Sequence, residues 1–312
     1  MKQQNQSFRF VQISDIHIGS PFSYHYQPSW VENFEQCLKQ INQLNPKPEF
    51  IVLTGDLTRD GNTHLFELRH ILEWINKLPY KVYVIPGNHD VGGRPETKKE
   101  SRFTQKSLSH YLSVFSQDHF EFIFQDIQFI GLNSFLFASQ VPAEQQQWQW
   151  LEALTEKIIK EKRRSFWFMH TLPFHKSPFE SLDSVPSFDS GDGYQLTDHA
   201  SQIKLMNLLK KCKADFIANG HTHVYLDRTI DGFRQISCPS TAFLIEDSSA
   251  LGFMIYDIEG DKVTATMERL NKESTTAGYG GGILKMALRD YSIAWQKDDM
   301  ISEEINLIKS QL

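Results

Sequence analysis

The chain has 312 residues, 40% of them hydrophobic, and a formal net charge of -6 at pH 7. This hydrophobic content, which includes 23 Phe and 6 Trp, excludes a disordered protein and is ordinary for a globular enzyme with a large core. The negative charge argues against a nucleic-acid polymer as partner, because such a partner usually requires a basic face.

The cysteines and the apolar runs indicate the cellular compartment. Cys37, Cys212 and Cys238 contain no Cys-x-x-Cys spacing and make no disulfide framework, which indicates a reducing environment. Residues 1–7 are polar, unlike a signal peptide, and no apolar run reaches the roughly 18 residues of a membrane span. We therefore expect a cytoplasmic protein without a membrane span.

Short apolar runs predict buried strands along the chain. The earliest four, at residues 10–13, 50–53, 82–85 and 166–169, are rich in β-branched and aromatic residues. Residues 120–124 and 127–133 alternate as a hairpin does, with a turn at 125–126, and a further strand is expected at 215–218. Successive short strands follow in 232–270, most clearly at 252–256 and 263–269, and we expect them to complete a second sheet.

The segments between these strands have apolar residues at helical spacing. The expected helices cover residues 30–45, 63–77, 142–162 and 200–213, and Pro46 and Pro48 end the first of them. Strands that alternate with helices predict an α/β fold.

Five polar clusters follow these strands directly. They are Asp15-Ile16-His17, Gly55-Asp56 with Asp60-Gly61, Gly87-Asn88-His89-Asp90, His170, and Gly220-His221-Thr222-His223. Taken alone, an Asp-x-His or a Gly-Asp turn is common, and a single histidine in the core is more often bonded to backbone. Because every cluster closes a strand, however, a sheet brings all five to one rim, where oxygen and imidazole ligands converge. This arrangement predicts a two-metal hydrolytic site.

In this order the clusters resemble the calcineurin-like metallophosphoesterase superfamily, over roughly residues 8–270. The first and last clusters look like the class III cyclic-nucleotide phosphodiesterase branch and the small lipid-precursor hydrolases. Residues 41–57, 87–92 and 132–134 look closer to the animal calcineurin-like serine/threonine phosphatase, which lacks the histidine that His17 supplies here. The resemblance implies a four-layer α/β/β/α sandwich of two mixed β-sheets flanked by helices.

We expect this catalytic domain to span residues 1–275. Residues 276–312 begin with the Gly-rich tract at 278–282 and continue with apolar residues at roughly helical spacing. A linker is the better interpretation of the tract, because no strand precedes it as in a phosphate-binding loop. The helical extension after it is expected to pack on the catalytic domain, to form a homodimer or to bind a partner.

The resemblance also implies the ligands of both metals. Those of one are Asp15, His17, Asp56 and His223, and those of the other are Asp56, Asn88, His170 and His221. Asp56 would bridge the two ions, since a carboxylate has two oxygens to share. Mixed nitrogen and oxygen ligation suits Mn, Fe, Zn or Co and leaves the native pair open.

His89 is the expected catalytic residue that binds no metal. A phosphate ester resists hydrolysis because its negative charge repels hydroxide, so two metals would neutralise that charge and supply a bridging hydroxide. His89 would protonate the departing alkoxide or stabilise the charged phosphorane, unless it only supports a ligand. In the serine/threonine phosphatases an aspartate and then an arginine follow the second cluster. Here Arg59-Asp60 reverses that order, so neither the Asp–His dyad nor the phosphate-binding arginine of those enzymes is carried over.

The loops at 19–29, 91–102 and 171–197 leave the motif-bearing ends of the strands and should line the substrate site. They combine aromatic and cationic side chains, and the candidates for substrate contact are Arg94, His175 and Tyr194. We expect a small organic or nucleotide-type phosphomonoester or phosphodiester as substrate. A protein serine/threonine phosphatase and a binding protein on the same fold are the alternatives.

Overall fold

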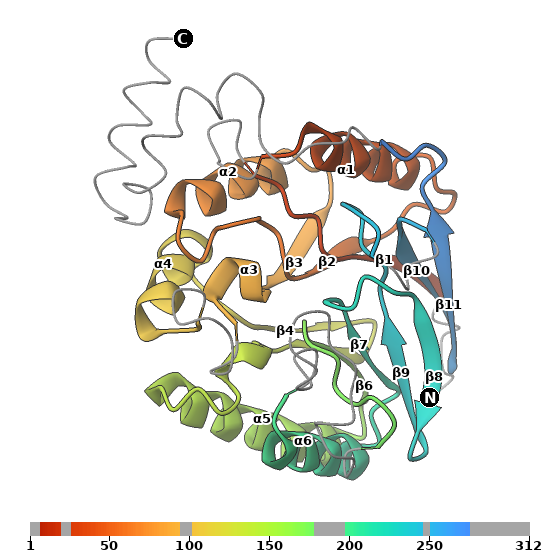
Figure 1. Cartoon of the computed structure of the whole chain (residues 1–312). Coiled ribbons are helices and arrows are strands. Elements are labelled where there is room, and N and C mark those ends of the chain that lie inside the picture. Colours follow the sequence, from red (N-terminus) through yellow and green to blue (C-terminus); the bar gives the residue numbers. More distant parts are fainter. Residues whose placement is uncertain (1–6, 20–25, 94–101, 178–196, 246–249, 275–312) are drawn as a thin grey trace.

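A computed structural model describes residues 7–19, 26–93, 102–177, 197–245 and 250–274 (Figure 1). The strands form two mixed sheets. The first has the order β11 (Lys262–Arg269), β10 (Gly252–Glu259), β1 (Ser7–Ile13), β2 (Phe50–Thr54) and β3 (Lys81–Ile85). The second has the order β4 (Phe120–Phe124), β5 (Ile127–Gly131), β6 (Arg164–Phe168), β7 (Phe216–Asn219), β9 (Phe233–Ser237) and β8 (Leu226–Ile230).

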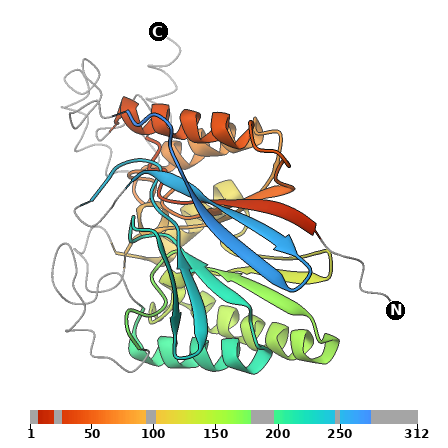
Figure 2. The ribbon, with the colours of Figure 1, turned by 90° about the vertical axis from the view of Figure 1, so that its right-hand side faces the viewer.

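Helices cover the outer faces of both sheets, so that the layers run helix, sheet, sheet, helix (Figure 2). The first sheet packs against α1 (Pro28–Ile41), α2 (Leu65–Asn76) and α4 (Gln105–Phe115). The second packs against α5 (Pro142–Glu161) and α6 (His199–Cys212). One-turn segments, α3 (Asn88–Val91) and η2 (Ser134–Leu136), complete the described elements. The expected four-layer sandwich is therefore confirmed.

The layers follow from the alternation of side chains along the strands. In β1, Phe8 and Phe10 point into the core between the sheets, whereas Val11 and Ile13 pack under the helices. The core between the sheets is largely aromatic: Phe10 stacks on Tyr256 with ring centroids 4.6 Å apart and meets Phe129 of the other sheet edge-on. Both faces of these strands are buried, which explains why they read as continuous apolar runs.

One expectation about the sheets is wrong. We expected the strands at 252–256 and 263–269 to complete the second sheet, but β10 pairs antiparallel with β1 in the first, and β11 follows it. The hairpin of β8 and β9 completes the second sheet instead. The reason is that β10 is apolar on both faces, with Ile255 under the helices and Met254 between the sheets. The position beside β1 buries both of these faces.

Helix boundaries differ from expectation by a few residues. The first helix begins at Pro28, because a proline in the first turn gives up no hydrogen bond, and it ends at Ile41, several residues before Pro46. The other three expected helices, now α2, α5 and α6, shift by at most two residues at either end. None of the helices in the described part of the chain combines the length and apolar character that crossing a bilayer requires.

The parallel strands end together at one rim. Ile13 of β1 is in register with Leu53 of β2, and Leu53 with Val84 of β3. In the second sheet, β6 and β7 run parallel side by side. The segments that follow these five strands are those with the polar clusters, as the sequence predicts.

A polar contact ties the two sheets together beneath this rim. The Gln12 amide donates to Thr54 Oγ1 at 2.9 Å within the first sheet and to the carbonyl of Asn219 in the second at 3.2 Å. Its oxygen accepts a hydrogen bond from the Tyr256 hydroxyl at 2.7 Å. Because all of these groups are buried and bonded, they fix the relative position of the sheets under the clusters.

Candidate metal centre

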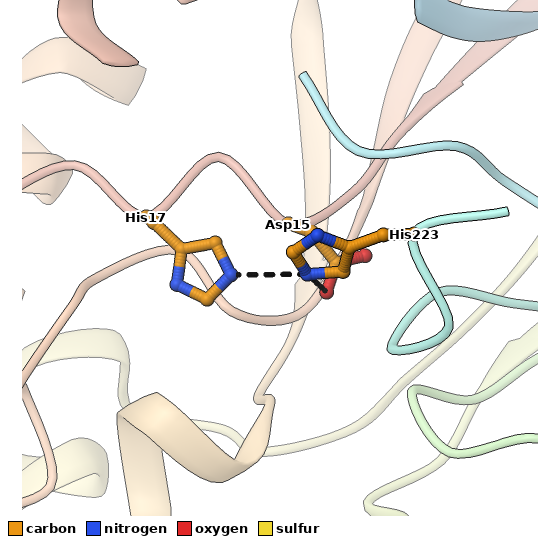
Figure 3. A group of neighbouring side chains, drawn as sticks. All are labelled: Asp15, His17 and His223. Atoms are coloured by element: carbon orange, nitrogen blue, oxygen red, sulfur yellow. Dashed lines mark hydrogen bonds and ion pairs between the residues drawn. The ribbon is translucent and has the colours of Figure 1, made fainter. Parts of the chain in front are cut away.

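The polar clusters converge into two neighbouring groups of side chains, each with ligand atoms within 4.8 Å of one another. One group is Asp15, His17 and His223 (Figure 3), and the other is Asp56, His170 and His221. His221 and His223, two residues apart, thus belong to different groups. His89 lies beside the same centre, in an overlapping group with His17 and Asp56, whereas Asp60 falls in a separate group at the start of α2.

Asp56 lies between the two groups. Its Oδ2 atom is 3.6 Å from Nε2 of His17 in one group and 3.4 Å from Nε2 of His170 in the other. Its Oδ1 atom accepts the backbone N–H of His89 at 2.9 Å. One carboxylate oxygen is therefore held in place while the other faces both groups.

Asp15, like Asp56, lies close to side chains of both ligand groups. Its Oδ1 atom is 3.3 Å from Nε2 of His223 and 3.9 Å from Nε2 of His170. Both of its oxygens lie close to the backbone N–H of His221, at 3.2 and 3.0 Å, so the first and last clusters are bonded directly to each other.

Backbone carbonyls orient the histidine rings. Nδ1 lies 2.6 Å from the Thr54 carbonyl in His170, 3.2 Å from the Phe243 carbonyl in His223, and 2.6 Å from the Arg59 carbonyl in His89. A carbonyl only accepts, so the ring donates through Nδ1–H, and Nε2 of the neutral imidazole keeps its lone pair. In His170 and His223 the Nε2 atom faces a carboxylate oxygen, Asp56 Oδ2 at 3.4 Å and Asp15 Oδ1 at 3.3 Å.

The donor set fits metal ions on these grounds. Nε2 of His17 and Nε2 of His223 face each other at 3.4 Å, and His170 Nε2 is fully buried with no hydrogen-bond partner among the described residues. Lone pairs directed at one another repel unless a proton or a cation lies between them. Four buried imidazoles and two buried carboxylates match transition-metal ions, which accept mixed nitrogen and oxygen ligands.

The ligand-bearing backbone is strained. Five non-glycine residues of the clusters have left-handed backbone angles, with φ of 54° at Asp15, 45° at His17, 48° at Asp56, 67° at His221 and 55° at His223. Each such conformation costs on the order of 1 kcal/mol or more. The surrounding fold holds these residues in conformations they would not adopt alone, and it thereby directs their side chains to one point.

Two glycines permit the close approach of the clusters. Gly55 has φ of 91°, and a Cβ atom there would lie 2.5 Å from Nδ1 of His170. A Cβ atom on Gly220 would lie 1.8 Å from Ser14 Oγ and 2.7 Å from Asp15 Oδ2. Any larger residue would push apart the segments that carry the predicted ligands.

Asp90 is a buried residue whose role could not be predicted from the sequence. Its carboxylate accepts the backbone N–H groups of Leu57, Thr58 and Gly87, and the Thr58 hydroxyl, at 2.7 to 3.1 Å. It therefore fastens the loop after Asp56 to the turn that begins α3. Its place in the third cluster was visible in the sequence, but its bonding partners were not.

Protons are distributed unevenly over the centre. Burial lowers the pKa of His170, but the adjacent carboxylate of Asp56 outweighs it and raises this pKa to about 9. Burial, together with the neighbouring His170, lowers the pKa of His221 to about 3. Burial would raise the pKa of Asp56, yet His170 and His89 hold it well below its usual range. Without metal, one proton on His170 offsets part of the negative charge of the carboxylates.

His89 and Arg59 form one side of the centre. The half-buried His89 ring meets His17 edge-on at 4.8 Å, and Arg59 Nη1 lies 3.1 Å from both ring nitrogens of His89. No carboxylate in the described part of the chain pairs with Arg59, and its Nε is buried without a hydrogen-bond partner there. A guanidinium beside a metal centre, without its own counter-ion, is suited to bind an anion. Sequence reasoning set Arg59 aside because its order with Asp60 is reversed.

The remaining candidates are placed only in part. Asn88 is buried as the first residue of α3, next to the centre along the chain. His175 is half-buried and belongs to none of the ligand groups. Arg94 and Tyr194 lie outside the described residues, as do most of the loops expected to line the substrate site.

Residues 8–225 match the family of calcineurin-like phosphoesterases. The chain belongs to the calcineurin-like phosphoesterase family. This match confirms the resemblance that the five clusters indicate, and the ligand groups described above fit the dinuclear site expected from it.

Similar proteins within this family include phosphatases and phosphodiesterases. The chain is 28% identical over 200 residues to the serine/threonine-protein phosphatase CPPED1 of Mus musculus, covering 61% of this chain and 58% of that protein. It is 28% identical over 156 residues to a probable glycerophosphodiester phosphodiesterase GpdQ of Arcobacter nitrofigilis, covering 49% and 53%. The matches thus span little more than half the length of these relatives. A dimetal phosphatase from Danio rerio shares the fold, with a TM-score of 0.57 and 15% identity over 85% of this chain and 97% of that one.

Proposed function

We propose that this chain is a dinuclear metal-dependent phosphoesterase that hydrolyses a small organic or nucleotide-type phosphomonoester or phosphodiester. The observation that carries the proposal is Oδ2 of Asp56, which faces His17 on one side and His170 on the other. Two metal ions bound there would neutralise the charge of a phosphate ester and supply a hydroxide at neutral pH.

The proposed ligands of the two ions share Asp56. Asp15, His17, Asp56 and His223 would hold one ion, and Asp56, Asn88, His170 and His221 the other. The two groups of ligand atoms support this division, and Asp56 approaches the first group through its contact with His17. Asn88 is in neither group and is proposed because it lies at the start of α3, next to the centre along the chain. Manganese, iron, zinc and cobalt all suit such ligands.

His89 and Arg59 would act on the substrate. With Nδ1–H of His89 held by the Arg59 carbonyl, Nε2 of the doubly protonated ring is the atom that would deliver a proton to the departing alkoxide. The Arg59 guanidinium would bind a non-bridging oxygen of the phosphate, because it lies against His89 and has no carboxylate partner in the described chain.

The similarity to CPPED1 supports a second candidate function, a protein serine/threonine phosphatase. This function needs an open groove that admits a folded phosphoprotein, whereas a small ester needs only a pocket over the metals. The domain boundary at residue 275 and a homodimer formed through residues 276–312 stay predictions, since residues 275–312 lie outside the described part of the chain. The cytoplasmic location also stays a prediction.

The decisive experiment combines metal content with a substrate panel. Chelation should abolish hydrolysis, and Mn or a similar ion should restore it, with two ions bound per chain. Asp56→Ala should be the most damaging ligand change because it removes a ligand from both ions. The matched control is Asp126→Ala, a carboxylate 76% exposed in the β4–β5 turn. Full activity in chelator, or fewer than one ion per chain under excess Mn, would refute the proposal, and hydrolysis of phosphoproteins but not small esters would favour the second candidate.

A further inference from the structure

The peptide between Arg59 and Asp60 joins the His89 ring to a buried carboxylate of α2. The carbonyl of this peptide accepts a hydrogen bond from Nδ1 of His89 at 2.6 Å, and its N–H donates to Oε2 of Glu67 at 2.7 Å. The peptide is trans, so its C=O and N–H groups point in opposite directions and their two partners lie at its opposite ends. The Glu67 carboxylate, one peptide unit and the His89 ring therefore form a single hydrogen-bonded chain.

The start of α2 accounts for the position of Glu67. This residue is fully buried in the first turn of the helix, whose N-cap is His64. A carboxylate is favoured there, because the N–H groups at the start of a helix create a positive potential. In a capping box, a glutamate at this position bonds to the N–H of the N-cap residue. Glu67 bonds instead to the N–H of Asp60, so its side chain is directed at the loop that precedes the helix.

Other groups hold the main chain of His89. Its N–H donates to Oδ1 of Asp56 at 2.9 Å, and its carbonyl accepts a hydrogen bond from the N–H of Asn62 at 2.9 Å. These two bonds fix the backbone but do not set the side-chain torsions of the ring. The Arg59 carbonyl is the group that accepts the ring N–H, so the orientation of this one peptide decides where Nε2 points.

A carboxylate at the N–H end of a peptide strengthens the hydrogen bond at its C=O end. Hydrogen bonds in series polarise one another, and a negative charge at the N–H increases the electron density on the carbonyl oxygen. In the described part of the chain, the ring N–H of His89 is bonded to this carbonyl and not to a carboxylate. Glu67 thus supplies through a peptide the support that a carboxylate gives directly to many functional histidines.

We propose that Glu67 is a positioning residue for His89 and acts through the peptide between Arg59 and Asp60. This inference rests on the proposed phosphoesterase function, in which Nε2 of His89 gives its proton to the departing alkoxide as the P–O bond breaks. The ring keeps its other hydrogen on Nδ1, bonded to the Arg59 carbonyl. Glu67 holds the peptide that accepts this bond, and it thereby keeps Nε2 directed at the leaving oxygen. It takes no part in the proton transfer itself.

The first test is Glu67→Gln, which keeps the size of the side chain and an acceptor oxygen for the Asp60 N–H but removes the charge. The metal-loaded protein is assayed on para-nitrophenyl, phenyl and ethyl phosphates, as monoesters and as diesters. We expect kcat on the ethyl ester to fall about 10-fold, and Glu67→Ala to lower it toward 100-fold, the range typical of residues that orient a functional histidine. The para-nitrophenyl ester should be affected little, because its alcohol departs without a proton, and KM should stay near the wild-type value.

A double-mutant cycle separates positioning from a general effect on folding. In a His89→Ala background, Glu67→Gln should change the rate on the phenyl ester by less than about 2-fold, because the group through which it acts is gone. The matched control is Glu73→Gln, since Glu73 is an exposed glutamate of the same helix, and this variant should keep wild-type rates. Both Glu67 variants should bind two ions per chain with wild-type affinity.

A second readout needs neither turnover nor metal. In metal-free protein with isotope-labelled histidine, the Nδ1–H proton of His89 gives an NMR resonance that is assigned by its loss in His89→Ala. This resonance should shift upfield in Glu67→Gln and further in Glu67→Ala, with faster exchange with water, because the bond to the Arg59 carbonyl weakens. Glu73→Gln should leave it unchanged.

Two results would overturn the positioning role. One is an Nδ1–H resonance that both Glu67 variants leave unchanged, or that exchanges with water in the wild type as fast as in Glu67→Ala. The other is an equal loss of kcat on all three esters together with weaker metal binding, which would show that Glu67 only stabilises the fold. If no ester is hydrolysed, the proposed function fails, and the resonance still decides whether Glu67 orients the His89 ring.

Discussion

Nε2 of His170 lies 3.4 Å from Oδ2 of Asp56, and its Nδ1 is bonded to the Thr54 carbonyl at 2.6 Å. The ring is fully buried, so both its orientation and its charge are set by these neighbours. In the metal-free protein the carboxylate raises the pKa of His170 to about 9, against the effect of burial. If these two side chains bind a metal ion, binding would release that proton.

The first prediction concerns pH. Because the pKa of His170 is higher in the folded metal-free protein than the ordinary 6.5, its protonation stabilises the fold below pH 6.5. This stabilisation is lost as pH rises to about 9. Denaturant unfolding in chelator should therefore show a falling free energy of unfolding between these pH values. The metal-loaded protein should lack this decline, and calorimetry in buffers of different ionisation heat should detect proton release on metal binding near pH 7. Identical pH profiles with and without metal would contradict the prediction.

The second prediction concerns His89. His89→Ala should keep metal occupancy and lower turnover roughly 100- to 10,000-fold, the usual contribution of a general acid. The loss should be greatest for esters with poor leaving groups, since an activated alcohol departs without a proton. The control is His119→Ala, a histidine whose side chain is 41% exposed next to β4. Equal losses on activated and unactivated esters would mean that His89 only supports the centre.

The third prediction concerns Arg59, whose guanidinium lies against His89. Arg59→Ala removes the proposed phosphate contact but keeps the backbone carbonyl that orients His89. Hydrogen bonds to charged groups contribute about 1.5–3 kcal/mol, so kcat/KM should fall roughly 10- to 100-fold, with Arg59→Lys intermediate. Affinity for inorganic phosphate should weaken in parallel. Unchanged phosphate affinity in Arg59→Ala would show that this side chain does not contact the phosphate.

The centre could be predicted from the sequence because it depends on local order. Asp15, Asp56 and His170 each close a buried strand, and parallel strands carry their ends to one rim whatever the rest of the chain does. By contrast, β10 fits beside β1 only through an antiparallel pairing about 240 residues apart in sequence, which no local pattern specifies.

Contacts between loops could not be predicted from the sequence either. Arg59 lies within the second cluster but meets His89 of the third, and Phe243 reaches His223 from a segment that belongs to no cluster. The reversed order of Arg59 and Asp60 even argued against a role for the arginine. Sequence order thus locates residues at strand ends, whereas the conformation of each loop decides which neighbouring side chains point to the metals.

The last prediction concerns Asp90, which accepts four hydrogen bonds and donates none. Asp90→Asn keeps the size of the side chain but replaces one acceptor oxygen with an NH₂ group. That group must face backbone N–H donors, which leaves buried polar groups without partners. Since an unsatisfied buried group costs about 1–3 kcal/mol, the metal-free protein should lose roughly that much free energy of unfolding, and metal affinity should fall because the Asp56 loop and the α3 turn separate.

Asp227→Asn is the control for this variant, since Asp227 pairs with Arg234 on the partly exposed β8–β9 hairpin. It should change stability little, because such pairs contribute about 1 kcal/mol or less. Urea unfolding and metal titration of both variants decide the matter. If Asp90→Asn keeps wild-type stability and metal affinity, the carboxylate does not hold the two loops together, and the hydrogen bonds of Asp56 to the backbone N–H groups of His17 and His89 suffice to hold its strained backbone.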